Sequence, residues 1–382
     1  MGNTTTLGNK SKFRELLDSF GLPRLIIACF LLLLLIAAPC VGLDFPTQIT
    51  NIITRFSWNA VMVLAMVPMV HSGCGLNFGL PLGIVSGLLG ATLSIELGYT
   101  GFASFLMAIL IATPFALLFG GGYGWLLNKI KGGEMVTSYF IAYCMTGVYQ
   151  LVVLYMMGPI IPILHNTLKL PRGFGIRNTV SLLQMRQSVD NALAVYVGGV
   201  KIPVLTLIII ALACLFIVWF RRTKLGQDMR AVGQDMNVAR DAGINVDRTR
   251  LISIVMSTVF AGFGMIIYLQ NMGNFPTYTA HTNVGMFCIA ALLVGGASVE
   301  KASIGNVFLG VLLFHTMFIV APAAGTKITG DSMIGEYFRV FVSYAVITVA
   351  LVMYEAKKRK ENRTLGQQLA IEQKAEEEGR TA

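Results

Sequence analysis

Long apolar runs alternate with short polar segments over most of the 382 residues. A run of roughly 17 to 25 apolar residues is long enough for a helix to cross the hydrocarbon core of a membrane. The pattern predicts an all-α polytopic membrane protein with about ten transmembrane helices, in a transmembrane domain over residues 25–354 between polar ends at 1–24 and 355–382. The expected spans are Leu25 to Leu43, Ser57 to Cys74, Phe78 to Ile95, Gly101 to Leu127, Val136 to Met157, Val204 to Phe220, Leu251 to Leu269, Val284 to Ala297, Ile304 to Pro322 and Phe338 to Tyr354.

The composition supports this class. Hydrophobic residues make up 55% of the chain and charged residues 13%, whereas about a quarter of a typical soluble domain is charged. The six cysteines are scattered, without a CxxC pair or a Cys/His cluster. We therefore expect them to pack as small apolar side chains, and we expect no metal site.

The positive charge indicates the orientation. With ten spans and a cytoplasmic N-terminus, 21 of the 29 Lys and Arg residues fall in segments on the cytoplasmic side. Because basic residues favour that side, both termini are expected in the cytoplasm. The net charge of +10 thus reflects membrane topology and gives no reason to expect a nucleic-acid partner.

Two segments depart from the pattern of continuous spanning helices. Residues 159–201 are rich in Pro, Gly and polar residues, so this stretch is expected to be extracytoplasmic or to line a cavity. The glycine clusters are expected mainly to allow close helix packing, but "HSGCGLNFGLPLG" also breaks a helix and is a candidate pathway wall. Candidate pathway residues, each equally able to satisfy nearby backbone, are His71, Asn77, Asn271 and Asn274.

The sequence carries no recognisable catalytic motif. It has no GxxxxGK[ST] phosphate loop, HExxH or GxSxG pattern, so neither an ATPase site nor another enzyme activity is assigned. Carboxylates inside the predicted spans are scarce, and Glu96 is expected at an outer end. Proton or sodium coupling through carboxylates is therefore disfavoured, although an ion-coupled secondary transporter remains the alternative.

A polar stretch, "GQDMRAVGQDMNVARDAGI", separates two strongly apolar runs. Gly226 to Val232 is expected to continue the preceding span, and Gly233 to end it. Asp235 is a good N-cap for a short helix from Met236 to Ala242, and the following Gly243 suits its C-terminus. Met236, Ala239 and Ala242 form one apolar stripe that a partner's groove could accept. An ordinary solvated loop is the other interpretation.

This stretch resembles the cytoplasmic loop of permease subunits of bacterial ATP-binding cassette importers for ribose, other simple sugars, nucleosides and branched-chain amino acids. The family pattern reads roughly G-x-x-x-R-A-V-G-x-N-P-x-A-A-x-x-A-G-I; here Asp235 and Met236 replace its Asn-Pro, which removes a proline suited to the first helical position. The resemblance implies a coupling helix in the cytoplasmic loop 221–250 that transmits the closure of a partner ATPase. The implied coupling residues are Gly226, Arg230, Gly233, Asp235, Met236, Ala239, Ala242, Gly243 and Ile244.

Two further segments extend the resemblance. "AALLVGGASVEKASIGNVFLGVLL" resembles the family's A-x-x-L-G-G-x-S-x-x-G-x-x-x-G segment through Gly295, Gly296, Ser298, Gly305 and Gly310, and "GGEMVTSYFIAYCMTGVYQ" resembles a segment of the nucleoside-type branch. Because the predicted spans contain so little charge, a neutral polar solute is expected, most of all a simple sugar or a nucleoside. Branched-chain amino acids or another small solute are the alternatives.

The resemblance also implies partners and a location. The chain is expected in the bacterial inner membrane, as a dimer with a second permease copy or a paralogue, bound to two ABC ATPase subunits and receiving solute from an extracytoplasmic binding protein. ATP and Mg would bind to the ATPase, and no cofactor is expected in this chain.

Overall fold

The computed structural model describes residues 45–161, 163, 169–171 and 173–331, together with isolated positions between 333 and 352. These residues form a mostly helical bundle with four short strands. The predicted segments at 1–24 and 355–382 and the span from Leu25 to Leu43 lie outside the described residues, and the last predicted span is described only at isolated positions.

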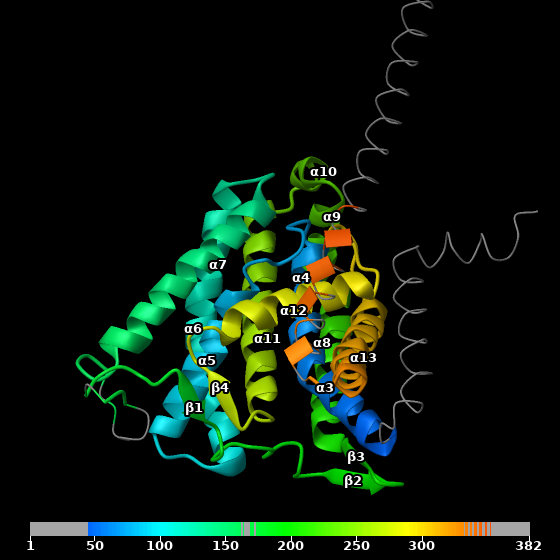
Figure 1. The fold of residues 1–382 in the computed structure, drawn as a ribbon. Helices are drawn as coiled ribbons and strands as arrows, with labels where there is room; N and C mark the ends of the chain where they lie inside the picture. Colours follow the sequence, from blue (N-terminus) through cyan, green and yellow to red (C-terminus); the bar gives the residue numbers. More distant parts are fainter. Residues whose placement is uncertain are drawn as a thin grey trace, which may run out of the picture.

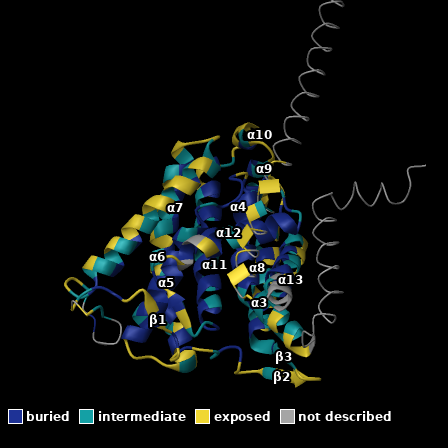
Figure 2. Cartoon of the chain, in the orientation of Figure 1, coloured by how far each residue is buried: buried dark blue, intermediate teal, exposed yellow. Residues whose placement is uncertain are grey.

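Three helices form the centre of the bundle (Figure 1). These are α5 (Leu80–Glu96), α6 (Gly101–Lys129) and α11 (Val246–Leu269), which contact one another more extensively than any other described elements. Figure 2 shows α5 almost wholly buried and α11 buried over much of its length, whereas the outer helix α7 (Glu134–Leu151), which continues into the π-helix Val152–Met156, has few buried residues. The other helices are α3 (Phe45–Leu64), α4 (Met66–His71), α8 (Val204–Arg222), α9 (Lys224–Gln234), α10 (Met236–Asp241), α12 (Ala280–Val294) and α13 (Ile304–Thr329).

Glycine permits the close approach of these helices. A Cβ on Gly83 would lie 2.4 Å from the carbonyl oxygen of Thr258, so α5 meets the backbone of α11 directly. Likewise, a Cβ on Gly310 of α13 would lie 2.0 Å from the carbonyl oxygen of Ala291 in α12. The glycine clusters therefore serve close helix packing, as expected for small residues between membrane helices.

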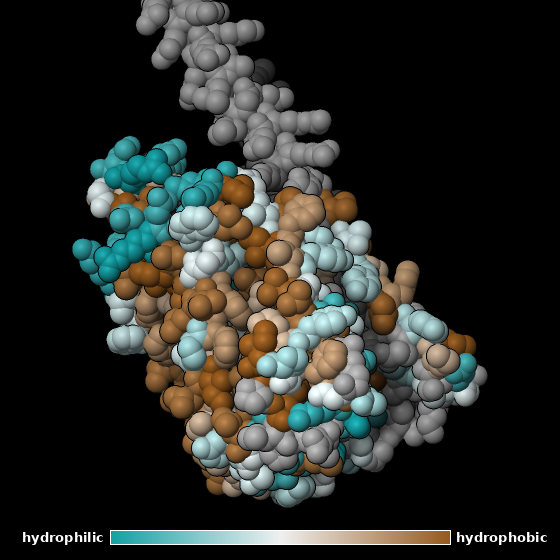
Figure 3. Space-filling view, turned by 90° about the vertical axis from the view of Figure 1, so that its left-hand side faces the viewer, coloured by the Kyte–Doolittle hydropathy of each residue, from teal (hydrophilic) through white to brown (hydrophobic). Residues whose placement is uncertain are grey.

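The spans agree with the sequence pattern in most of the described chain. Five helical segments are long and apolar enough to cross a membrane: Pro46–His71, Gly101–Lys129, Glu134–Met156, Val204–Arg222 and Val246–Leu269. The apolar segments Leu80–Glu96, Asn283–Val294 and Ile304–Val320 are shorter. Figure 3 shows the corresponding surface, a broad apolar belt beneath a hydrophilic cap at the α10 end. The chain is therefore an integral membrane protein with at least five helices suited to span.

The strands correct the all-α prediction. Strands β1 (Thr179–Ser181) and β4 (Asn274–Pro276) pair antiparallel, as do β2 (Ala194–Val197) and β3 (Val200–Pro203). All four lie at the end of the bundle opposite α10 (Figure 1). Three belong to residues 159–201, where Pro and Gly excluded a spanning helix but gave no prediction of strand pairing.

Candidate functional site: the α9–α10 element and the helix break beneath it

The polar stretch forms two short helices of its own. The α8 helix ends at Arg222, and Thr223 caps the separate helix α9 by accepting a hydrogen bond from the Gly226 N–H. The prediction that Gly226 to Val232 continues α8 is therefore wrong, because the Thr223 cap begins a new helix. Helix α9 also passes Gly233 and ends at Gln234.

Helix α10 begins where its cap predicts. One Asp235 carboxylate oxygen accepts hydrogen bonds from the N–H groups of Asn237 (2.7 Å) and Val238 (3.1 Å). These are donors that a helix leaves unpaired at its start, so Asp235 stabilises the α10 terminus. The helix ends at Asp241 rather than at Ala242, and Gly243 follows with a φ of 82°, a backbone conformation that glycine adopts without strain.

The apolar stripe of α10 is covered by the chain itself. Ala239 is buried in a small cluster with Val232 of α9 and Val246 of α11, and Met236 and Ile244 pack against this cluster. Ala242 is exposed and does not continue the stripe. The stripe is therefore not a free surface for a partner's groove, because it anchors α10 to the bundle. The exposed side chains of α10 include Val238, at 65% exposure, together with Asn237, Arg240 and Asp241.

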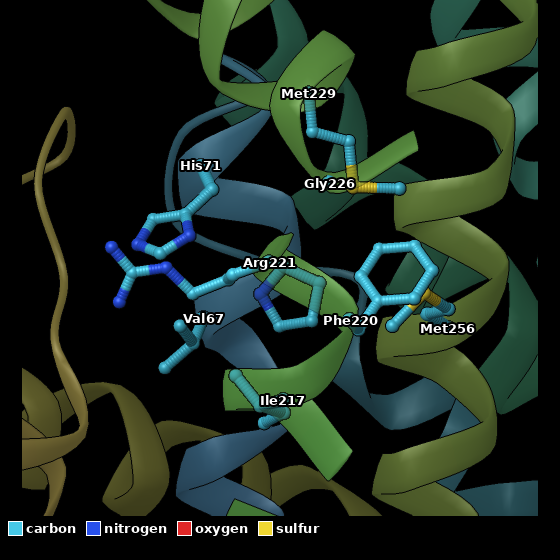
Figure 4. A pocket seen from close by; sticks show the side chains of 9 residues that line it. Val67, His71, Ile217, Phe220, Arg221, Gly226, Met229 and Met256 are labelled. Carbon is cyan, nitrogen blue, oxygen red and sulfur yellow. The ribbon is translucent and has the colours of Figure 1, made fainter. Parts of the chain in front are cut away.

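Helix α9 meets the chain break between α4 and α5 without any intervening side chain. A Cβ on Gly233 would lie 2.2 Å from the His71 carbonyl oxygen and 3.2 Å from the Gly73 nitrogen. The His71 side chain extends from the same turn and its Nε2 lies 2.7 Å from the Ala302 carbonyl oxygen. In Figure 4 the His71 ring and the Arg221 side chain lie beside each other at the edge of a small pocket between α4, α8, α9 and α11.

Polar side chains connect the break to three helices. The Ser72 and Ser253 hydroxyls lie 2.6 Å apart, and the Asn77 amide donates to the Ser257 hydroxyl at 2.8 Å. The Tyr123 hydroxyl lies 3.0 Å from Asn77 Oδ1 and 2.7 Å from the Ser138 hydroxyl. These side chains come from the break and from α6, α7 and α11. A displacement of the break would therefore strain or shift hydrogen bonds to all three helices.

The four candidate pathway residues do not converge on one site. His71 and Asn77 flank the break at the α10 end, and Asn77 is buried with both amide atoms paired within the chain. Asn271 and Asn274 follow α11 at the strand-bearing end; Asn271 is buried without a side-chain hydrogen bond, whereas Asn274 is exposed in β4. The Asn77 side chain thus hydrogen-bonds to Ser257 and Tyr123, whereas the buried amide of Asn271 makes no hydrogen bond to the described residues.

A wide cleft opens beside the break. Its volume is ≈ 1000 Å³, and its walls come from four separate chain segments, at residues 71–75, 132–136, 221–234 and 299–302. Arg221, Arg230 and Lys301 give these walls positive charge, and Glu134 and Glu300 give negative charge. Four connections that are distant in sequence therefore meet at the end that carries α9 and α10.

A buried ion pair lies at the same end and could not be identified from the sequence. An Arg250 guanidinium nitrogen lies 2.6 Å from Glu134 Oε1, and the Arg250 side chain is fully buried. Its other terminal nitrogen lies 3.3 Å from the Met236 sulfur. The only sequence signal was a single charge at the start of each of two apolar runs, and nothing in the sequence pairs positions 116 residues apart.

Comparison with known proteins identifies the family. Residues 48–351 match the model of the family described as "Branched-chain amino acid transport system / permease component". The chain belongs to this permease family. The match covers most of the chain and confirms the resemblance that the α9–α10 stretch and the glycine-rich segment indicated.

Individual relatives match shorter parts. A nucleoside ABC transporter permease protein of Lactococcus lactis is 28% identical over 161 residues, 42% of this chain and 38% of the relative. A xylose transport system permease protein of Haemophilus influenzae is 32% identical over 122 residues, 31% of this chain and 32% of that protein. A guanosine ABC transporter permease protein of Bacillus subtilis is 34% identical over 89 residues, which make up 23% of this chain and 28% of that protein. The chain thus matches well under half the length of these relatives.

Among solved structures, one described as an inward-facing ABC transporter of the metal-chelate type aligns with a TM-score of 0.45 and 12% identity. The alignment covers 86% of this chain and 99% of that chain. Nothing further rests on this likeness.

Proposed function

We propose that the chain is the permease subunit of an ATP-binding cassette importer that moves a neutral polar solute, most of all a simple sugar or a nucleoside. Family membership supports the permease role, and relatives named for nucleosides and xylose support this solute class. In this proposal the chain spans the membrane ten times with both termini and the α10 end in the cytoplasm. A second permease copy or a paralogue completes the pathway, and an extracytoplasmic binding protein delivers the solute.

ATP hydrolysis enters from outside the chain in this proposal. A partner ABC ATPase binds ATP and Mg and docks against α10, which acts as the coupling helix. The observation that carries the proposal is the contact between Gly233 and the His71–Gly73 turn. Because backbone meets backbone there, a push on the α9–α10 element displaces the break instead of being absorbed by flexible side chains.

The test is association with an ABC ATPase, whose gene we expect beside that of the permease, measured by co-purification from membranes that contain both proteins. Val238→Asp places a charge on the exposed face of α10, and we expect it to weaken association by about 10-fold or more, since a buried unpaired charge at an interface is costly. The matched control is Val197→Asp in β2 at the opposite end, where Val197 is 60% exposed against 65% for Val238. Equal association of both variants with the ATPase would contradict docking at α10.

Uptake into proteoliposomes distinguishes the alternatives. We expect accumulation of nucleoside or sugar that requires ATP and persists when an uncoupler removes the ion gradient. An ion-coupled secondary transporter would give the reverse result. A thermal-shift screen of the associated binding protein against nucleosides, sugars and branched-chain amino acids assigns the solute.

A further inference from the structure

Arg250 joins two elements, α7 and α10, through direct contacts of one side chain. It lies in the first turns of α11, and its guanidinium contacts both Glu134, the first residue of α7, and Met236, the first residue of α10. The planar guanidinium fixes the direction of both contacts, as a flexible ammonium would not. The start of α7 and the start of α10 are thus held by one rigid group.

The location of this ion pair is unusual for a group that only stabilises the fold. The free energy lost when both charges leave water is of similar size to the free energy gained from their attraction. Apolar residues of similar volume therefore often stabilise a fold as well as a buried ion pair does. Arg250 is fully buried, whereas the Glu134 side chain keeps 12% exposure at the wall of the wide cleft. One partner is therefore fixed in the bundle and the other lies at a boundary with water.

Helix α7 is attached to the bundle through a row of polar side chains as well as through apolar ones such as Ala142 and Tyr149. Along one face, at steps of four or eight residues, Glu134 pairs with Arg250, Ser138 with Tyr123, Thr146 with His281 (2.9 Å), and Gln150 with the Tyr278 carbonyl oxygen (3.3 Å). Many of its apolar side chains are exposed instead, and only 17% of its most apolar stretch is buried. The polar row gives α7 directional contacts along its length, and its first residue, Glu134, is held by Arg250.

We propose that Arg250 and Glu134 are positioning residues that pass the displacement of α10 to the start of α7. This rests on the proposed function, because it takes the docked ATPase as the source of the displacement. The Gly233 contact carries motion to the break, which Tyr123 also links to Ser138 of α7, and the ion pair carries it directly to Glu134 at the start of α7. The two helices therefore respond together when nucleotide closes the ATPase.

Hydrogen–deuterium exchange tests this on the complete permease–ATPase complex in nanodiscs, with and without ATP trapped by vanadate. In the unmodified complex we expect trapping to change exchange both in residues 224–242 and in residues 134–140. In Arg250→Met the change in 224–242 remains, the change in 134–140 becomes smaller than in the unmodified complex, and uptake per ATP hydrolysed falls by about 10-fold, within the range of ordinary coupling strengths. Arg250→Lys, which retains the charge, restores part of both signals.

The matched control is the second ion pair at this end. Lys131 lies 2.6 Å from Asp247, with side-chain exposures of 31% and 62%, and it also joins the segment before α7 to α11. We expect Lys131→Met to change uptake per ATP by less than about 2-fold, because exposed pairs contribute little. Glu134→Gln combined with Arg250→Met removes both charges and, if the pair acts as a unit, loses no more coupling than Arg250→Met alone.

The outcomes separate the two proposals. If no ATPase associates, or if trapping leaves residues 224–242 unchanged in the unmodified complex, the proposed function fails. If residues 134–140 respond as strongly in Arg250→Met or in the double variant as in the unmodified complex, or if Lys131→Met loses as much coupling as Arg250→Met, the link through Arg250 is wrong while the proposed function stands.

Discussion

A methyl group at Gly233 tests the contact through which α9 meets the helix break. In Gly233→Ala the new Cβ would lie 2.2 Å from the His71 carbonyl oxygen and 3.0 Å from the His71 carbonyl carbon. Both atoms belong to the backbone, so no side-chain rotation relieves the overlap. Helix α9 and the turn must separate by roughly 1 Å, and overpacking of this kind costs about 1–3 kcal/mol.

This cost predicts the size of the functional effect. If the separation disfavours the arrangement in which α9 presses on the turn, about 1–3 kcal/mol corresponds to a 5- to 150-fold change in that equilibrium. We expect ATP-driven uptake into proteoliposomes to fall within this range while ATPase association persists, because Val238 and the other exposed side chains of α10 are unchanged. Thermal unfolding of the purified complex measures the structural cost separately.

Gly330→Ala is the matched control for this prediction. Gly330 ends α13 with a φ of 77°, and a Cβ there would meet nothing within 4 Å. The substitution costs about 1–2 kcal/mol through backbone strain alone, which is comparable to the cost at Gly233 but at the opposite end of the bundle. If Gly233→Ala and Gly330→Ala lose uptake equally, and only in proportion to their lowered melting temperatures, transmission through Gly233 is refuted.

Two further substitutions test local features. Asp235→Ala removes the acceptor for the Asn237 and Val238 N–H groups and should destabilise α10 by about 0.5–2 kcal/mol. We expect faster hydrogen exchange over residues 236–241 in this variant. Asp235→Ser, which keeps a capping oxygen, should retain most of the protection. Gly310→Ala should destabilise the fold by about 1–3 kcal/mol and lower the melting temperature, because its Cβ would lie 2.0 Å from a backbone oxygen of α12. Gly305→Ala is the control and should be neutral, since its Cβ would meet only the Ser303 hydroxyl, at 3.7 Å. Equal melting temperatures of the two variants would contradict the backbone contact at Gly310.

Features encoded within a few residues were predictable from the sequence. Helix α6 was expected at 101–127 and runs to Lys129, and α8 was expected at 204–220 and runs to Arg222. The Asp235 cap and the turn at Gly243 were likewise correct, because each depends on one residue's own hydrogen bond or backbone freedom. The family assignment followed from the same local stretch.

Features that depend on distant segments were not predictable. The strand pair β1–β4 joins residues about a hundred positions apart, and the Glu134–Arg250 pair spans 116. The apolar stripe of α10 was identified from its spacing, but spacing does not tell whether a partner or the same chain covers it. Here Val232 and Val246 cover it, so the surface offered to a partner is the opposite, polar face with Val238.

Being covered by its own chain would allow so short a helix to transmit force in the proposed complex. Helix α10 has six residues, and an isolated helix of that length is unstable in water. Three attachments hold it: the Asp235 cap, the buried Ala239, and Met236 against the guanidinium of Arg250. The cap holds the helix start and the two side chains anchor one face, so α10 resists both unwinding and rotation. In the proposed complex a docked partner would move α9 and α10 as one body, and the shift would reach the break through Gly233 and α7 through Arg250.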